Sequence, residues 1–96
     1  MNRVYLNQLF DYYHSLLTAN EQDIFQKYYE EDLTLQEIAD EGQISKSAIS
    51  KTLKTVEKKL LNYEEKLLLN HNRIEINKLL HNKIDNELLE KVNKYI

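Results

Sequence analysis

The chain has 96 residues with no cysteine, no proline and a single glycine, and its formal charge at pH 7 is −3. A chain this short buries only about 60–65% of its unfolded surface, which leaves no room for both a core and a substrate-sized cavity, and without cysteine it has neither disulfides nor a thiolate metal site. No apolar run approaches the roughly 20 residues of a membrane span and the N-terminus lacks a signal-peptide pattern, so we expect a cytoplasmic protein without membrane insertion.

The composition favours an all-α fold. The turns of strand-rich domains draw on glycine and proline, which this chain nearly lacks. Leucine, lysine, glutamate and glutamine are abundant instead, and these residues favour helices. We therefore predict that the chain is all-α.

Periodicity and a capping signal define the first two predicted helices. Over residues 3–17, apolar side chains recur at helical spacing and form one stripe, made of Leu6, Leu9, Phe10, Tyr13, Leu16 and Leu17. Thr18 and Glu21 have the spacing of a capping box, in which each side chain accepts a backbone N–H of the other. The second helix is expected over about residues 19–30, with an inward face of Ile24, Phe25, Tyr28 and Tyr29.

A second capping box, Thr34 with Glu37, begins a short third helix over about residues 35–41. Its expected inward residues are Leu35, Ile38 and Ala39. Gly42 and Gln43 end this helix, and Ile44 is expected to be buried in the turn that follows. Ser45 is the predicted N-cap of the next helix.

The fourth helix starts at Lys46, and its apolar residues are spaced four and three apart like a heptad seam, in the order Ile49, Leu53, Val56, Leu60, Tyr63 and Leu67. Either one helix runs over about residues 46–69, or two helices break near Asn62. The seam either packs on the first helix of its own chain or forms a contact between two chains.

The C-terminal part is predicted to form a helical extension over residues 70–96, separate from a domain over residues 1–69. It begins with the polar break Asn70-His71-Asn72, and it continues with an amphipathic segment that contains Ile74, Ile76, Leu79 and Leu80. Asp85 is a candidate cap for a last helix whose apolar residues are Leu88, Leu89, Val92 and Ile96. A 96-residue monomer has difficulty covering the seam and these stripes together. We therefore expect a two-fold homodimer.

The charge is unevenly distributed along the chain. Residues 1–44 carry two basic and nine acidic residues, whereas residues 45–59 carry five lysines and one glutamate, a local net charge of +4. Residues 60–96 are balanced. Because local potential matters more than total charge, the short basic segment is a candidate site for an anionic partner.

The basic segment lies in a helix-turn-helix pattern over about residues 34–55, LTLQEIADEGQISKSAISKTLKT in its wider context. Ala39 is small where the second helix crosses, and Ala48, Ile49 and Leu53 are expected to face inward. The outward residues are then candidates to contact the phosphates and bases of duplex DNA, and we assign to this site Ser45, Lys46, Ser47, Ser50, Lys51, Lys54 and Lys58.

Over roughly its first two-thirds, the chain resembles the YlxM family, small bacterial proteins related to region 4 of RNA polymerase sigma factors. The resemblance lies in the segments Leu9-Phe10-Asp11-Tyr12-Tyr13, Leu16-Leu17-Thr18, Tyr28-Tyr29, Leu33-Thr34-Leu35-Gln36-Glu37-Ile38-Ala39, Ile44-Ser45-Lys46-Ser47-Ala48-Ile49 and Tyr63-Glu64-Glu65-Lys66-Leu67. It implies a sigma-region-4-like helix-turn-helix bundle with a long helix. It also implies a regulatory role linked to the signal recognition particle pathway, with particle components as partners.

The chain departs from the family pattern at two places. Gly42 stands where an apolar residue is expected and Gln43 where glycine is expected, and a left-handed glutamine costs about 1 kcal/mol more than glycine. The recognition face carries lysines and no arginine, so it lacks bidentate contacts with guanine. Strong sequence specificity is therefore not expected.

Other residue patterns point to no further chemistry. His14, His71 and His81 show no ligand spacing, so neither a metal nor another cofactor is predicted. Glu64 and Glu65 are expected on a solvated face. Ser45 has no base beside it in the sequence, so its role is capping and we predict no enzyme. The alternative to DNA or RNA binding is a protein-interaction adaptor that reuses the fold.

Overall fold

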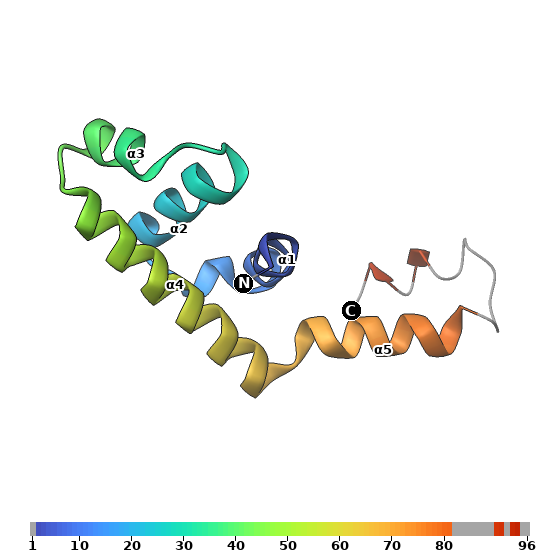
Figure 1. Cartoon of the computed structure of the whole chain (residues 1–96). Coiled ribbons are helices and arrows are strands. Elements are labelled where there is room, and N and C mark those ends of the chain that lie inside the picture. Colours follow the sequence, from blue (N-terminus) through green and yellow to red (C-terminus); the bar gives the residue numbers. More distant parts are fainter. Residues whose placement is uncertain (1, 82–89, 92, 95–96) are drawn as a thin grey trace.

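The computed structural model describes residues 2–81, 90, 91, 93 and 94. These residues form helices and no strand, which confirms the predicted all-α class. Figure 1 shows the α-helices in chain order, which are α1 (Arg3–Tyr13), α2 (Ala19–Phe25), α3 (Leu35–Gly42), α4 (Lys46–Leu67) and α5 (Leu69–Leu80).

Side-chain caps begin the helices where the sequence predicts them. Thr18 Oγ1 accepts the Glu21 N–H at 3.1 Å, and the Glu21 carboxylate accepts the Thr18 N–H at 2.9 Å. Thr34 and Glu37 repeat this capping box with distances of 3.1 and 3.2 Å. Ser45 Oγ accepts a backbone N–H in the first turn of α4 at 3.1 Å. Both capping boxes and the serine cap are therefore confirmed.

The first two helices change type before they end. After α1 the chain forms a 3-10 turn at His14–Leu16, and after α2 it forms a π-helical turn at Gln26–Glu30. The 3-10 turn has three residues per turn, which takes Leu16 out of the apolar stripe and leaves it 52% exposed, while Leu17 is buried. The prediction that Leu16 faces inward is therefore wrong.

Gln43 forms the tight turn between α3 and α4. Its φ of 54° is left-handed, and its N–H and that of Ile44 donate to the carbonyls of Asp40 and Ala39, at 3.3 and 3.0 Å. This is a Schellman ending. The predicted burial of Ile44 is wrong, since its side chain is 47% exposed. The side chain lies over the Cα of Gly42 and not between the two helices. A Cβ added to Gly42 would be 3.7 Å from Ile44 Cγ1.

Helix α4 is the common wall of two apolar clusters, with α1, α2 and α3 on one side of it (Figure 1). One cluster joins α4 to α1 and α2, and its buried members are Leu6, Leu9, Phe10, Tyr13, Leu17, Phe25, Val56 and Leu60. The other joins α4 to α2 and α3, and its buried members are Ile24, Ile38, Ala39, Ile49 and Leu53. Tyr29 packs against both. The seam from Ile49 to Leu60 is thus covered within its own chain, while Leu67 is 50% exposed.

Helix α4 is continuous through Asn62, so the one-helix alternative is correct, although the helix ends at Leu67. Leu68 follows in the left-handed region, with φ 53°, and α5 starts at Leu69. The predicted break at Asn70-His71-Asn72 is therefore wrong, because these residues lie inside α5.

A buried glutamate explains the position of this break. Tyr13 Oη donates to Glu64 Oε1 at 2.6 Å, and the N–H groups of Asn70 and His71 donate to the same carboxylate at 3.1 and 3.0 Å. The Leu69 N–H donates to Tyr13 Oη at 3.1 Å. Burial and the hydrogen bond with Glu64 raise the pKa of Tyr13 to about 12. Glu64 is thus the N-terminal cap of α5, supplied from α4.

The prediction that Glu64 lies on a solvated face is wrong, because its carboxylate is enclosed at this joint and the residue is only 6% exposed. We expect Glu64→Ala to lower the free energy of unfolding by about 2 kcal/mol, since it leaves three donors without their partner. Glu65→Ala is the matched control, because Glu65 is exposed, and it is expected to change stability by less than about 0.5 kcal/mol. Urea denaturation monitored by circular dichroism measures both, and equal midpoints for the two variants would contradict this role of Glu64.

The predicted amphipathic segment falls within α5, where Ile74 and Leu79 are 41% and 69% exposed. Asn77 and Asn93 exchange two side-chain amide hydrogen bonds of 2.8 Å each. The predicted cap Asp85 and the apolar residues Leu88, Leu89, Val92 and Ile96 lie outside the described residues. None of the described helices has the length and apolar content required to cross a bilayer. The division into residues 1–69 and 70–96 stays a prediction.

Candidate nucleic-acid interface

Three of the four lysines assigned from the sequence lie along the side of α4 that is opposite to the core. Ser47, Lys51, Lys54 and Lys58 repeat the spacing of the buried seam but are displaced from it by two residues. Two residues correspond to about 200° around an α-helix, so these side chains point away from α1, α2 and α3. Lys46, three residues before Ile49, lies near the line of the seam in the exposed first turn of the helix. We call Lys46, Lys51, Lys54 and Lys58 together the lysine stripe.

Among the described residues, the four ammonium groups of the lysine stripe have no acidic partner. All four residues are exposed, and within the described part of the chain none of them forms a salt bridge. Other lysines of the same region do form ion pairs, since Lys27 contacts Asp23 at 2.9 Å and Glu41 at 3.2 Å. The stripe is therefore a concentration of uncompensated positive charge on a protein of net negative charge.

A shallow groove runs between α3 and the start of α4. It has a volume of about 610 Å³, and it is lined by Leu35, Lys46, Ser47, Ser50, Lys51 and Lys54. The structure thus brings five of the seven assigned residues to one groove. Ser45 and Lys58 are not in this lining, since Ser45 caps α4 and Lys58 lies a turn further along the helix. Ala48 was predicted to face inward, but it is exposed. It lies in the first turn of α4, before the first residue of this helix that reaches the core.

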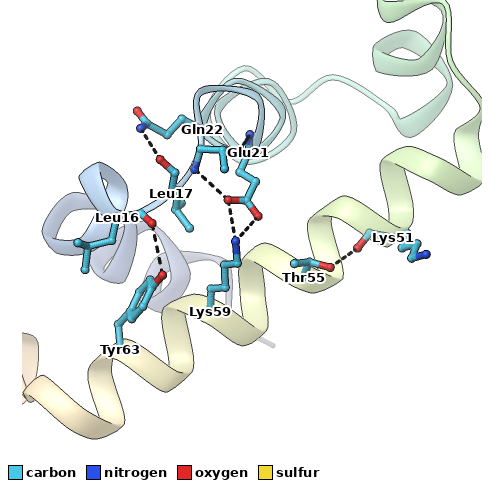
Figure 2. A network of polar contacts seen from close by, with 9 residues as sticks. Leu16, Leu17, Glu21, Gln22, Lys51, Thr55, Lys59 and Tyr63 are labelled. Carbon is cyan, nitrogen blue, oxygen red and sulfur yellow. Dashed lines mark hydrogen bonds and ion pairs between the residues drawn. The ribbon is translucent and has the colours of Figure 1, made fainter.

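Lys59 points in a different direction from its neighbour Lys58, because successive residues are rotated by about 100° around the helix axis. Figure 2 shows its ammonium group against the Glu21 carboxylate, with contacts of 3.0 and 2.8 Å. Although burial opposes ionisation of Glu21, hydrogen bonds from Lys59 and from the Thr18 N–H hold its pKa below the usual value. This pair fastens the start of α2 to α4.

The one glutamate among these lysines is also engaged by a partner. Tyr29 Oη, which the π-helical turn carries, donates to the Glu57 carboxylate. Burial and this bond raise the pKa of Tyr29 above its ordinary value. The guanidinium of Arg3 donates to the Tyr28 and Tyr29 carbonyls at 2.6 and 3.2 Å and so fixes the turn. Glu57 is thus bound to the flank of α4 that faces the π-helical turn, next to the stripe.

Sequence reasoning missed the Glu21–Lys59 and Tyr29–Glu57 pairs. Each joins residues that are 38 or 28 positions apart, and no local pattern connects them. A helical projection of residues 46–67 would have shown that Lys59 and Glu57 lie to the sides of the lysine face, where they can reach other helices.

Exposed acidic side chains lie on α3, the first helix of the motif. Glu37, Asp40 and Glu41 are exposed, and Asp40 accepts a hydrogen bond from Gln36 at 2.8 Å. Among residues 2–81, 90, 91, 93 and 94, no group of three or more histidines, aspartates and glutamates has a geometry that could hold a metal ion. The exposed charge of the motif is thus basic on one face of α4 and acidic on α3.

A family model described as helix-turn-helix protein, YlxM / p13 like (UPF0122) matches residues 1–95. A UPF0122 protein of Desulforamulus reducens is 50% identical over 62 residues, which are 65% of this chain and 53% of the relative. A UPF0122 protein of Anoxybacillus flavithermus is 41% identical over 76 residues, which are 79% of this chain and 69% of the relative. The UPF0122 protein YlxM of Bacillus subtilis is 45% identical over 64 residues, 67% of this chain and 58% of the relative. The match thus spans from about half to about two thirds of the length of these relatives.

Proposed function

Because the chain belongs to the UPF0122 family of YlxM / p13 like helix-turn-helix proteins, we propose that it binds duplex DNA through α4 as a regulatory protein. The family is a helix-turn-helix family rather than an enzyme family, and we propose no catalytic role. The proposed contacts are those assigned from the sequence, with the lysine stripe on phosphates and the serines on phosphates or base edges.

The observation that supports this proposal best is the lysine stripe. Four exposed ammonium groups without an ion-pair partner among the described residues lie on the second helix of the motif, three of them opposite its buried seam. A helix-turn-helix places this helix in the major groove. The absence of arginine from this face favours phosphate contacts over guanine readout, so we expect weak sequence preference.

Salt titration of the affinity for a labelled duplex tests this proposal. Each phosphate that a lysine neutralises contributes about −0.9 to the slope of log K against log salt. Three or four contacts predict a slope of about −3 in the low-salt range. Fluorescence anisotropy with a 20-base-pair duplex measures the slope. A binding constant that is indifferent to salt, or no binding at micromolar protein, would contradict the proposal.

The second candidate is a protein-interaction adaptor, and the exposed acids of α3 favour it. Glu37 and Asp40 are exposed acids of the same motif, which would repel phosphates and which a basic protein surface would complement. The same titration separates the two functions, because an adaptor binds neither duplex DNA nor RNA. Sequencing the nucleic acid that co-purifies with the protein distinguishes DNA from RNA.

We propose a homodimer that uses the end of α4 and the C-terminal segments. Leu67, Leu68, Leu69 and Leu79 are each between 42% and 69% exposed, and exposed apolar side chains in contiguous patches tend to mark interfaces. Two recognition helices on one duplex would offset the weak readout of one. Sedimentation equilibrium at tens of micromolar is expected to give the dimer mass. The monomer mass would contradict the dimer without affecting the DNA proposal.

The link with the signal recognition particle pathway and the cytoplasmic location also stay proposals. They derive from the family resemblance and from the composition, respectively. Affinity purification of the protein from its bacterium, followed by identification of the bound proteins and nucleic acid, is the corresponding test. Recovery of particle components above the level found with an α4 lysine variant is the expected result.

A further inference from the structure

A second groove flanks α4 on the side of α2. It has a volume of about 310 Å³ and is lined by Thr18, Asn20, Glu21, Lys51, Thr52 and Thr55. Lys51 lines this groove and the groove on the α3 side. The part of α4 that carries Lys51 therefore has a polar groove on each flank.

The spacing of the two grooves can be compared with the dimensions of DNA. An α-helix with its side chains is about 10–12 Å wide, and the major groove is about 12 Å wide. When a recognition helix fills the major groove, the two sugar–phosphate backbones lie along its two flanks. A protein with a polar groove on each flank of that helix has a place for a phosphate of either strand.

We propose that the groove between the start of α2 and α4 binds a backbone phosphate of the DNA strand on the α2 side. This inference rests on the proposed function and extends its site beyond the lysine stripe. The donors are the Lys51 ammonium group, the Asn20 side-chain amide and the Thr52 hydroxyl. Within the described residues, none of these three groups donates a hydrogen bond to the protein. Thr55 has a different role, because its hydroxyl donates to the Lys51 carbonyl at 3.1 Å (Figure 2).

Glu21 would repel a phosphate from this groove if its carboxylate were free. Its Oε1 accepts from the Thr18 N–H at 2.9 Å and from Lys59 at 3.0 Å, and its Oε2 lies 2.8 Å from Lys59 Nζ. The Glu21 side chain is only 10% exposed. Lys59 is therefore a positioning residue, which neutralises the wall of the groove without contacting the ligand.

Variants of the groove test this proposal in the full chain. Asn20→Ala and Thr52→Val each remove a donor and keep the fold, since Asn20 is exposed and valine has the shape of threonine. Each is expected to weaken binding of a 20-base-pair duplex about fivefold, the effect of one hydrogen bond. Asn62→Ala is the matched control, because Asn62 is an exposed asparagine of α4 that lies outside the lining. Its affinity should equal that of the wild type.

The role of Lys59 is tested by a pair of variants. Lys59→Gln is expected to weaken binding because it exposes the charge of Glu21, and Glu21→Gln added to it is expected to restore most of the affinity. Glutamine keeps the capping box with Thr18, and circular dichroism checks the fold. No restoration of affinity by the second substitution would overturn this role of Lys59. A melting temperature that falls in Lys59→Gln and recovers with the affinity in the double variant would make the role structural instead.

The outcomes separate this proposal from the proposed function. Binding by the wild type together with unchanged affinity of the Asn20→Ala/Thr52→Val double variant would overturn the groove and leave the lysine stripe in place. Absence of binding by the wild type would overturn both. A loss of about 25-fold in the double variant at constant salt, with the wild-type melting temperature, is the result that we expect.

Discussion

Replacing Ile49 by aspartate is expected to remove a large part of the free energy of unfolding. Ile49 is 1% exposed and packs with Ile24, Ile38, Ala39 and Leu53. A carboxylate there has no cationic partner, and an unpaired buried charge costs about 3–5 kcal/mol or more. The free energy of unfolding of a domain of this size is about 5–14 kcal/mol. Thermal melts followed by circular dichroism should show a melting temperature that is lower by at least about 15 °C.

Two controls define what this result means. Ile49→Val keeps the apolar contact and should cost only about 1 kcal/mol. Lys51→Ala, two residues further on the opposite face, should change stability by less than about 0.5 kcal/mol. An Ile49→Asp protein with an unchanged melting temperature would mean that the buried and exposed faces of α4 are wrongly assigned.

The triple variant Lys46→Gln/Lys51→Gln/Lys54→Gln is expected to lose most of the affinity for duplex DNA. Each lysine that leaves a phosphate reduces the salt slope by about 0.9, so the slope should become less negative by about 2.7. At 0.1 M salt this corresponds to a loss of affinity of two to three orders of magnitude. The fold should be unaffected, since the three side chains are exposed.

Lys66→Gln/Lys78→Gln is the control for a general effect of charge. Both residues are exposed and lie outside the two grooves beside α4. The double variant should keep the wild-type slope, because neither side chain is proposed to contact a phosphate. A triple variant with the slope of the wild type would remove the lysine stripe from the DNA site and place the phosphate contacts elsewhere on the protein.

Local signals predicted the elements of this fold well. Thr18, Thr34 and Ser45 each begin a helix through bonds to residues three positions ahead, and such bonds are visible as sequence spacing. The seam from Ile49 to Leu60 was predictable for the same reason, because period and burial coincide on one helix face. The exposed face that carries the proposed DNA site follows directly from the seam.

The errors arose where contacts distant in sequence decide the structure. The break after α4 was predicted at Asn70-His71-Asn72 because these residues are polar, but Tyr13 and Glu64, which are 51 residues apart, place it at Leu68. No residue pattern predicts a leucine with positive φ. The conformational cost of this leucine is offset by the cap that the buried carboxylate gives to α5. The predicted burial of Ile44 was wrong for a simpler reason. Gly42 has no side chain, and this leaves space for the apolar side chain of Ile44 at the surface of the turn.

The position of α4 in both apolar clusters has a consequence for how the molecule opens. A helix–turn–helix that packed only on itself could unfold locally while α1 and α2 kept their structure. Here the same helix contributes Ile49 and Leu53 to one cluster and Val56 and Leu60 to the other, so neither cluster can lose it alone. The amides of this segment should therefore exchange their hydrogens only through global unfolding, as one cooperative unit. The surface that α4 presents to a partner is thus as rigid as the most stable part of the chain.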